Sequence, residues 1–504
     1  MKIFSAEQIK QIDEFTIANE PIASIDLMER AAMACLKRIM KLTSLEDELL
    51  VFCGKGNNGG DGFAIARLLL ERGFNCNVFV INYTDTFSID AGINYNKLKE
   101  TFGTKISEIN SLEDLKEKIT HKNYVVIDAL LGTGVNKTID GLLKETVSFI
   151  NANFNRIISI DIPSGLFPDE SSKGNEIIIH SSLTLTFQFP KLAFLFAENK
   201  NYVPEFEVLD IGLSPQAMNA QFTNFYYLTK RDVVSFLKPR NKFSHKGDFG
   251  HALLLAGSKG KSGAALISAK ACLRSGAGLL TVHSNKSTTD ALLQYLPEAM
   301  SVEDTNEEFI SEIDKPENYD AIGFGPGVGT QEETQIVLKK LLQYYTGKLI
   351  IDADGLNILS ENKTWMEFLP AETILTPHPK EFERLAGKHD NDFEKIKTLK
   401  HLSLKHNCIF LLKGAHSTVA FPDGSVFFNS SGNAGLAKGG SGDALTGIIL
   451  GLLSRGYSAP KATLMGMFIH GYSADLSIKK KSIESILISD VIDQLPKAFK
   501  KLEG

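Results

Sequence analysis

The chain has 504 residues, of which 43 % are hydrophobic, and its formal net charge at pH 7 is −6. A chain of this length exceeds one ordinary hydrophobic core, so two or more domains are expected. The slight negative charge argues against general binding to nucleic acid. No run of about 18 apolar residues is present, so no transmembrane helix and no membrane partner are expected.

Cysteine use and the first residues bear on the cellular compartment. The five cysteines form no CxxC pair, and their odd number argues against a disulfide framework. The first residues lack the apolar segment of a signal peptide. We therefore expect a cytoplasmic location, with the cysteines as small buried residues: Cys35, Cys53, Cys76, Cys272 and Cys408.

A glycine-rich loop follows the first predicted strand. Two helices are predicted in residues 5–44, and the apolar run at residues 49–53 predicts a buried strand. It leads into GKGNNGGDG at residues 54–62, before a helix predicted at residues 63–72. The loop matches GxGxxG, which is typical of dinucleotide-binding folds. The next strand, residues 77–81, ends without the expected acidic residue, so the ordinary form of that fold is disfavoured.

Two later strands are each followed by an aspartate. The strands are predicted at residues 124–127 and 156–160. One aspartate at a strand end is commonly a turn former or a helix cap. Two of them beside a polar glycine-rich loop favour a binding site, because ligands bind beyond the carboxyl ends of parallel strands. The side chains expected to converge there are Asn57, Asn58, Asp128, Asp161 and Ser164.

The motifs NNGGD, DALLGTG and DIPSGL, within about residues 1–215, resemble the NAD(P)H-hydrate epimerase family. The resemblance implies two loops that hold the hydrated cofactor: Asn57, Asn58, Gly59, Gly60 and Asp61, then Gly132, Thr133, Gly134, Val135, Asn136, Lys137 and Thr138. It implies a potassium ion bound by Asn58, Asp128 and Ser164, whose oxygens suit a hard cation. It also implies that Asp161 is the catalytic or substrate-binding carboxylate. The chain departs from the family at Lys137, where an aromatic residue is usual, and no second acid or base can be matched.

A linker is predicted at residues 214–227, which show no clean periodicity. It separates a first domain, residues 1–215, from a second, residues 228–504. No internal repeat relates the two halves.

The second half opens with a predicted strand at residues 251–255 and a helix at residues 263–275. The segment GSKGKS between them invites comparison with a Walker phosphate loop. That interpretation fails, because Leu255 stands where GxxxxGK[ST] requires a glycine.

Three more strands of the second half each lead into a polar loop. The strands are predicted at residues 319–324, 348–351 and 408–412, and the loops that follow are GPGVG, DADG and KGAHS. Successive glycine amides such as those of GPGVG can hold charged groups. The sequence also allows two plainer interpretations. Asp354 can be the cap of the next helix, and Lys413 can be a solvated charge at a strand end.

Two histidines of the second half are interpreted differently. His378 lies between two prolines, which stiffen its backbone and favour a functional position. His470 lies in an apolar stretch and is expected to be a core histidine.

The stretch GGSGD at residues 439–443 opens an apolar helix predicted at residues 444–453. Glycines at a helix start bring free N–H groups and the positive end of the helix dipole close to a ligand, which makes an anion site. Asp443 lies where an alcohol bound beside that site could lose its proton. In isolation, the same residues could simply form a turn and complement the helix dipole.

Six ordered blocks in about residues 230–504, from KGDFGH to GGSGD, resemble the nucleotide-dependent NAD(P)H-hydrate dehydratases of the ribokinase-like superfamily. The resemblance implies substrate contacts at Ala265, with Ala264 as the alternative, and at Gly327, His378 and Asp443, with Asp443 as the catalytic base. It implies contacts to ADP or ATP, with Mg²⁺, at Lys413, Gly414, Ala415, His416, Ser417, Gly440, Ser441 and Gly442.

Together these resemblances predict an α/β protein, with a Rossmann-like α/β/α domain followed by a ribokinase-like α/β/α domain. The expected function is that of a bifunctional enzyme that epimerises hydrated NADH or NADPH and dehydrates one epimer with a nucleotide. Two alternatives stay open: a small-molecule kinase with a fused nucleotide-binding sensor, and a first half that binds without catalysis. A homo-oligomer is expected.

Overall fold

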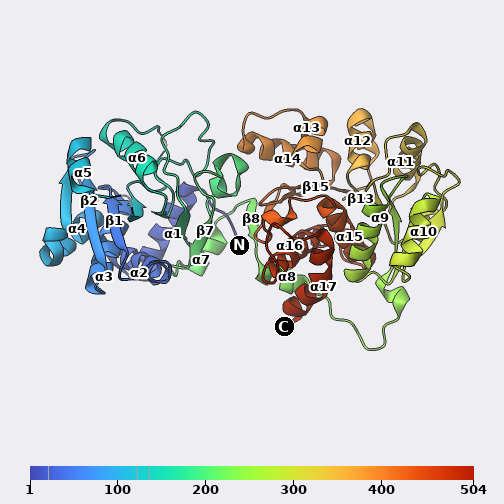
Figure 1. Cartoon of the computed structure of the whole chain (residues 1–504), viewed down its shortest axis with the longest axis horizontal. Helices are drawn as coiled ribbons and strands as arrows, with labels where there is room; N and C mark the ends of the chain where they lie inside the picture. The colour runs from blue at the N-terminus through green and yellow to red at the C-terminus, as the bar shows by residue number, and fades with distance from the viewer. Residues whose placement is uncertain (21, 122, 136) are drawn as a thin grey trace. The chain divides into compact units, whose positions relative to one another are not determined.

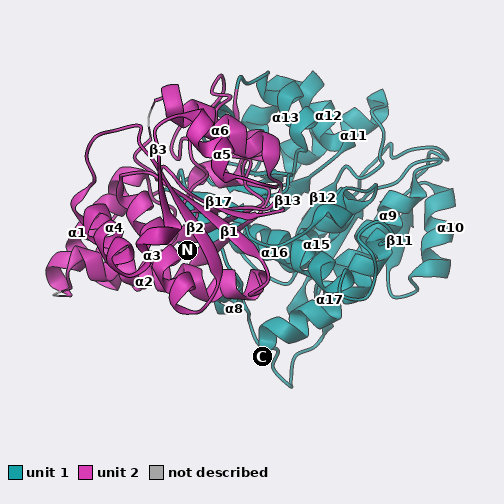
Figure 2. Cartoon of the chain, turned by 60° about the vertical axis from the view of Figure 1, so that its left-hand side comes forward, with its two compact units in different colours: residues 1, 224–390, 394–504 teal, residues 2–223, 391–393 magenta. Residues whose placement is uncertain are grey.

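The computed structural model describes residues 1–20, 22–121, 123–135 and 137–504, and the chain divides into two compact units (Figures 1 and 2). The N-terminal unit contains Lys2–Thr223 and Asn391–Phe393. The C-terminal unit contains Met1, Asn224–Asp390 and Glu394–Gly504. Among the helices of the described residues, none has the length and apolar character that a bilayer span requires.

The segment predicted to be a linker contains regular structure. Helix α7 (Pro215–Ala220) begins after Ser214, whose side chain accepts a hydrogen bond from Ala217 N. Strand β8 (Phe225–Leu228) then pairs with the edge of the second sheet. Both elements are too short to show a periodic pattern, which is why the sequence indicated neither.

The described residues of the N-terminal unit form a parallel seven-stranded sheet in the order β3-β2-β1-β4-β5-β6-β7. Its strands are β1 (Glu48–Cys53), β2 (Asn75–Ile81), β3 (Ile106–Ile109), β4 (Val125–Ala129), β5 (Ile157–Ile160), β6 (Leu183–Phe187) and β7 (Phe206–Leu209). The other helices are α1 (Ala6–Asn19), α2 (Ser24–Leu42), α3 (Asn57–Glu71), α4 (Ile89–Phe102), α5 (Leu112–Lys118) and α6 (Gly141–Asn153).

Both faces of this sheet are covered, as its nearly continuous apolar strands require. In β1, Leu49 and Val51 pack in the core shared with α2, α3 and α4. The alternate residues Leu50 and Phe52 pack in the core shared with α5 and α6. The unit is therefore the predicted Rossmann-like three-layer α/β/α domain.

The C-terminal unit has a ten-stranded sheet in the order β11-β10-β9-β12-β13-β14-β15-β16-β17-β8. Its strands besides β8 are β9 (His251–Leu255), β10 (Leu279–Ser284), β11 (Met300–Glu303), β12 (Ala321–Phe324), β13 (Lys348–Ile351), β14 (Ile374–Leu375), β15 (Ile409–Leu412), β16 (Thr418–Ala420) and β17 (Val426–Asn429). The pairings of β16 with its two neighbours are antiparallel, and the other pairings are parallel.

Helices cover both faces of this sheet as well. Figure 1 shows α11 (Glu332–Tyr344), α12 (Asp354–Glu361), α13 (Pro379–Ala386) and α14 (Asp392–His406) on one side of the strands. On the other side lie α15 (Ser441–Ser454), α16 (Ala459–Ser477) and α17 (Ile488–Glu503). The remaining helices are α8 (Lys230–Phe236), α9 (Ser262–Arg274) and α10 (Lys286–Tyr295).

Helix α15 lies at the centre of its layer, and its residues from Ala444 to Ser454 are all buried. It packs closely against α9 because two of its residues have no side chain. A Cβ atom on Gly447 would lie 2.1 Å from Ser268 O, and one on Gly451 would lie 2.4 Å from Cys272 O. The two backbones therefore approach to a distance that no other residue type allows.

We predict that Gly447→Ala lowers the free energy of unfolding of the C-terminal unit by about 1–3 kcal/mol, because the new methyl group forces the helices apart. Gly263→Ala on α9 is the matched control, since its added Cβ meets nothing within 4 Å. Urea unfolding followed by the fluorescence of Trp365, the single tryptophan of the chain, reports on this unit. Equal midpoints for the two variants would contradict the packing account.

Candidate active sites

The first candidate site lies at the point where the strand order of the N-terminal sheet reverses, between β1 and β4. The chain continues from β1 to β2 on one side and from β4 to β5 on the other, so a crevice is expected beyond the ends of β1 and β4. Helix α3 begins at Asn57, which differs from the predicted start at residue 63. The predicted loop residues NNGGD are therefore the first five residues of the helix, and Gly56 is its N-cap.

The helix can begin this early because Gly59 allows it to lie against the backbone. A Cβ atom on Gly59 would lie 1.9 Å from Gly54 O. The first-turn N–H groups, which have no intrahelical partner, are thereby held next to the strand ends. This arrangement suits an anionic ligand at the crevice.

The three predicted potassium ligands lie together around the backbone of Leu131. The Asn58 side-chain amide donates to Leu131 O at 2.8 Å, and the Ser164 hydroxyl accepts from Leu131 N at 2.9 Å. The Ser164 hydroxyl also donates to Asp128 Oδ1 at 2.6 Å. Asp128 lies inside β4 and is fully buried, not after the strand as predicted.

One buried oxygen of this cluster has no partner. Asn58 Oδ1 is inaccessible to solvent and accepts no hydrogen bond from the residues that the structure describes. By contrast, Asp128 accepts four hydrogen bonds, from Ser159, Ser164 twice and Leu130 N. Burial raises the pKa of Asp128, although those hydrogen bonds oppose the rise.

The second predicted substrate loop is partly placed next to this cluster. A Cβ atom on Gly132 would lie 3.3 Å from Asn58 Cβ, so the loop begins beside Asn58. The residues Gly134, Lys137 and Thr138 are exposed, and Thr133 and Val135 are half-buried. Asn136 lies outside the described residues.

Asp161 follows β5 in a left-handed backbone conformation, with φ of 64°. Its carboxylate forms an ion pair with Lys191, which is 2 % exposed, and accepts hydrogen bonds from Phe187 N and Thr186 Oγ1. Lys191 was not among the site residues predicted from the sequence. A lysine in the apolar stretch from Phe189 to Phe196 is the signal that could have indicated it.

The second candidate site lies at the start of α15. Gly440 is the N-cap and has φ of +91°, a left-handed conformation that glycine adopts without strain. The helix begins at Ser441, earlier than predicted, so Asp443 lies in its first turn. Burial, followed by the nearby charge of Asp352, raises the pKa of Asp443 to about 6.

Asp352 and Thr446, which are buried, and the half-buried Lys413 form a polar group next to that turn. Lys413 Nζ lies 2.7 Å from Asp352 Oδ1, and Thr446 Oγ1 donates to Asp352 Oδ2 at 2.8 Å. Burial alone would raise the pKa of Asp352, but the Lys413 ammonium and the Thr446 hydroxyl bring it below its usual value. Lys413 is thus not the freely solvated charge that the sequence left open. A Cβ atom on Gly442 would lie 3.1 Å from the Nζ atom of Lys413.

The GPGVG loop lies at the point where the strand order of the second sheet reverses, between β9 and β12. The Ser258 hydroxyl donates to Gly327 O at 2.7 Å, which connects this loop to the one after β9. Ala264 faces Gly327, because a Cβ atom on Gly327 would lie 3.1 Å from Ala264 Cβ. Ala265 is fully buried, so its predicted contact with substrate stays a prediction.

His378 is the N-cap of α13, and its Nδ1 atom accepts from Lys380 N at 3.1 Å and Glu381 N at 3.3 Å. Nδ1 is therefore the unprotonated nitrogen, and Nε2 carries the hydrogen. Burial, followed by the charge of Lys413, lowers the pKa of His378 and favours the neutral ring. His470 is buried, as predicted for a core histidine, and burial lowers its pKa to about 4.

The remaining predicted nucleotide contacts form the turn between β15 and β16. Gly414 and Ala415 are exposed, and the Ser417 hydroxyl lies 3.3 Å from Gly414 N and 3.1 Å from Gly414 O. His416 Nδ1 lies 3.1 Å from Asn429 O. The turn thus presents exposed backbone at the end of the strand that leads into Lys413.

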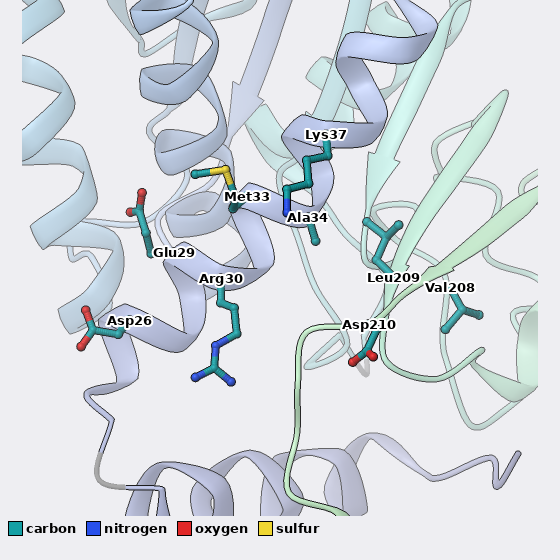
Figure 3. Close-up of a pocket in the computed structure, with 9 residues that line it drawn as sticks. All are labelled: Asp26, Glu29, Arg30, Met33, Ala34, Lys37, Val208, Leu209 and Asp210. Carbon is teal, nitrogen blue, oxygen red and sulfur yellow. The ribbon is translucent and has the colours of Figure 1, made fainter.

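A separate shallow groove of about 590 Å³ lies between α2 and β7 (Figure 3). Its charged side chains include Asp26, Glu29 and Arg30 of α2 and Asp210 after β7. None of the predicted site residues lines it. We therefore assign the candidate activity to the two clusters at the strand ends and not to this groove.

Comparison with known families agrees with this division. Residues 252–497 match the family model described as NAD(P)H-hydrate dehydratase, and residues 24–193 match the model described as YjeF-related protein N-terminus. The matches define a two-domain α/β enzyme of the hydrate dehydratase class with a fused YjeF-related domain.

Relatives that match along their whole length identify the family. The chain is 30 % identical to a bifunctional NAD(P)H-hydrate repair enzyme of Moorella thermoacetica and 32 % identical to one of Thermofilum pendens. Each alignment covers 100 % of this chain and 97 % of the relative. The chain belongs to the family of bifunctional NAD(P)H-hydrate repair enzymes.

Solved structures agree for the C-terminal unit. An ADP/ATP-dependent NAD(P)H-hydrate dehydratase from Bacillus subtilis, co-crystallised with ATP and Mg²⁺, is 32 % identical, with a TM-score of 0.50. The alignment covers 56 % of this chain and 100 % of that one. A ribokinase-like superfamily protein from Enterococcus faecalis is 28 % identical, also with a TM-score of 0.50. The predicted ribokinase-like fold is confirmed.

We predict that Lys413→Met lowers the free energy of unfolding of the C-terminal unit by about 3–5 kcal/mol at pH 7, because Asp352 becomes an unpaired buried charge. The double variant Asp352→Asn with Lys413→Met should recover most of that loss. Urea unfolding followed by Trp365 fluorescence is the measurement, and Lys380→Met, at an exposed position, is the control. A loss no larger than that of the control would contradict the buried ion pair.

Proposed function

We propose that this chain repairs hydrated NADH and NADPH in two reactions. The N-terminal unit interconverts the R and S epimers, and the C-terminal unit dehydrates the S epimer at the expense of ADP or ATP with Mg²⁺. The observation that carries the proposal is the half-buried Asp443 carboxyl in the first turn of α15, next to the amides of residues 440–442, in a chain of this family.

The dehydration begins with phosphoryl transfer to the ring hydroxyl. Asp443 accepts the hydroxyl proton while the oxygen attacks the terminal phosphorus of the nucleotide, whose bridging bond to oxygen breaks. The free amides at the start of α15 stabilise the charge on the transferred group. A pKa of about 6 suits this role, because Asp443 is mostly ionised at neutral pH and still basic enough to accept a proton.

The second stage expels phosphate. The electron pair of the ring nitrogen forms a C=N bond as the carbon–oxygen bond breaks and inorganic phosphate leaves. Loss of a proton from the neighbouring ring carbon then restores the reduced nicotinamide. The net change is removal of water from the hydrate and release of phosphate from the nucleotide, so a plain kinase is distinguished by a stable phosphorylated product.

The neighbouring predicted residues divide between the two ligands in this proposal. Gly327, His378 and either Ala264 or Ala265 contact the hydrated nicotinamide. The nucleotide contacts residues 413–417 and residues 440–442. The support is that Lys413, held by Asp352, lies beside Gly442 and that its charge acts on both His378 and Asp443.

For the N-terminal unit, we place the hydrated cofactor at the first turn of α3 and the loop of residues 132–138, with Asp161 at the reacting carbon. Lys191, the Phe187 amide and the Thr186 hydroxyl all bind the same oxygen of Asp161, Oδ1. A carboxylate held in a strained left-handed conformation is a feature typical of functional sites.

The residues around Asn58 fit a potassium ion. The unpartnered buried Asn58 Oδ1 supplies one ligand, and the Asp128 carboxylate and the Ser164 hydroxyl lie beside it. Oxygens of this mixed kind suit a hard cation. When bound, the ion would offset the buried negative charge of Asp128 and fix the loop after β4, next to which the substrate is proposed to bind.

Two further expectations remain proposals. A cytoplasmic location is supported by the five cysteines, all of which are free and buried. A homo-oligomeric state remains a prediction from the sequence.

The two activities should separate by single substitutions. Asp443→Asn should reduce dehydration by about 10²–10⁴-fold, because it removes the base, and leave epimer exchange intact. Asp161→Asn should abolish exchange and leave dehydration of the S epimer. Both epimers are followed by chromatography, with inorganic phosphate measured in parallel. In the unmodified chain, kcat/KM for dehydration should fall as the pH decreases through about 6, because the base becomes protonated.

Folding controls accompany these variants. Asp161→Asn leaves the Lys191 ammonium without its carboxylate, so circular dichroism and retained dehydration must show that the variant is folded. A folded Asp443→Asn variant that lost both activities would indicate one shared site. A phosphorylated nicotinamide product that persists would favour the kinase alternative.

Potassium should stabilise the N-terminal unit more than sodium does. At about 100 times the dissociation constant, a bound ion adds about 2–3 kcal/mol to the free energy of unfolding. Melting scans in KCl and NaCl measure the difference, and rubidium-soaked crystals should show anomalous density at Asn58 Oδ1. Asn58→Ala should remove the potassium effect, whereas Asn57→Ala, at an exposed position, should keep it. Identical melting in the two salts would exclude the site.

A further inference from the structure

Four ionisable side chains meet in the interior of the N-terminal unit, although they are far apart in the sequence. Asp13 lies on α1, Asp61 near the start of α3, Asp161 after β5 and Lys191 after β6. Ile12, next to Asp13, and Phe189, two residues before Lys191, share one hydrophobic cluster, which places this part of α1 against the chain after β6. Asp161 and Lys191 act on the proton affinity of Asp13, and Asp161 and Asp13 act on that of Asp61. Lys191 also acts on Asp169, whose carboxylate accepts from Ala6 N at 2.8 Å.

The single ammonium is directed to Asp161. Lys191 Nζ pairs with Asp161 Oδ1 and donates to Thr186 Oγ1 at 2.8 Å. Asp161 also accepts from Phe187 N at 3.1 Å. These donors stabilise the charged form of Asp161, and the nearly complete burial of Lys191 means that the ammonium in turn requires that charge.

Asp13 has no such compensation. Its Oδ1 atom is inaccessible to solvent and has no hydrogen-bond partner in the described part of the chain. Burial, followed by the charge of Asp161, raises the pKa of Asp13 to about 7, whereas Lys191 opposes the rise and Glu14 adds slightly to it. Asp13 can therefore both give and accept a proton near neutral pH. Burial raises the pKa of Asp61 well above its usual value, so Asp61 holds its proton more firmly.

We infer that Asp13 is the second acid–base residue of the epimerisation site, acting with Asp161, and that Lys191 is a positioning residue that holds the Asp161 carboxylate in place. This inference deepens the proposed epimerase function and depends on it. It supplies the proton donor that the sequence did not indicate. Two carboxyls in one site with opposite protonation states are the usual means by which an enzyme provides an acid and a base together.

Epimerisation by ring opening requires one group that accepts a proton and one that gives a proton. The hydrated carbon carries a hydroxyl group and is bonded to the ring nitrogen. Asp161 accepts the hydroxyl proton, a C=O bond forms, and the carbon–nitrogen bond breaks with its electron pair moving to nitrogen. Asp13 gives its proton to that nitrogen. After rotation of the carbonyl, nitrogen attacks the other face, its proton returns to Asp13, and the new alkoxide takes the proton from Asp161. No redox partner is consumed.

The test compares Asp13→Asn with Glu14→Gln, an exposed neighbour on the same helix, in the full-length chain. For Asp13→Asn we expect kcat of epimer exchange to fall by about 10²–10⁴-fold, with KM little changed. The limb of the pH profile near pH 7 should disappear. Dehydration by the C-terminal unit should continue, and Glu14→Gln should match the unmodified chain.

A stability measurement separates this role from a structural one. The pKa of Asp13 is raised in the folded state, so the unfolding free energy decreases as the pH rises from about 4 to about 7. Asp13→Asn removes that cost, so it should melt at a higher temperature than the unmodified chain above pH 7. A residue retained only for folding would give the opposite shift, and that result would overturn the inference.

Infrared spectroscopy with ¹³C-labelled aspartate tests the charge state without activity. The unmodified chain should show a protonated-carboxyl band that disappears as the pH rises through about 7, and Asp13→Asn should lack it. In Lys191→Met, exchange should slow while the band of Asp13 remains, because Asp161 loses the ammonium that holds its carboxylate.

Two further results would overturn the inference. One is exchange by Asp13→Asn within about threefold of the unmodified rate, far from the loss expected when a general acid is removed. The other is absence of the titrating band. If the unmodified chain exchanged no epimers, the proposed function itself would fail, and the catalytic role of Asp13 would fail with it.

Discussion

Both candidate sites depend on how closely a helix can approach the backbone next to it. In the N-terminal unit, α3 lies so close to the loop after β1 that Gly59 leaves no room for a Cβ atom beside Gly54 O. In the C-terminal unit, α15 lies equally close to α9 at Gly447. Free N–H groups at the start of each helix are thereby fixed beside the strand ends. An anion can bind there without any dedicated cationic side chain.

The two sites differ in how the charges of their buried carboxylates are compensated. In the C-terminal unit, Lys413 and Thr446 bind both oxygens of Asp352, and the uncompensated Asp443 has the raised proton affinity that a general base needs. In the N-terminal unit, the Lys191 ammonium pairs with Asp161, and burial raises the pKa of both Asp13 and Asp61. In both cases the pairing of one carboxylate leaves a neighbour free to exchange a proton.

The bounds of strands were predicted from the sequence more accurately than the first residues of helices. Strands β9 and β13 begin and end where they were predicted. Helices α3 and α15 begin earlier, at Asn57 and Ser441, because glycines that look like loop residues in a sequence become helical when the helix packs against backbone. The short elements α7 and β8 escaped prediction because they are stabilised by tertiary contacts and not by a periodic pattern.

The sequence by itself determined the family, the order of the motifs and the main carboxylates, because NNGGD, DIPSGL and GGSGD are local patterns with specific spacing. It could not determine which charges share an interior. Asp13, Asp61, Asp161 and Lys191 become neighbours only when α1, α3 and the ends of β5 and β6 pack around one crevice. Burial then decides which carboxyl keeps its proton, because the cost of a buried charge depends on its nearest ammonium and not on its position in the chain.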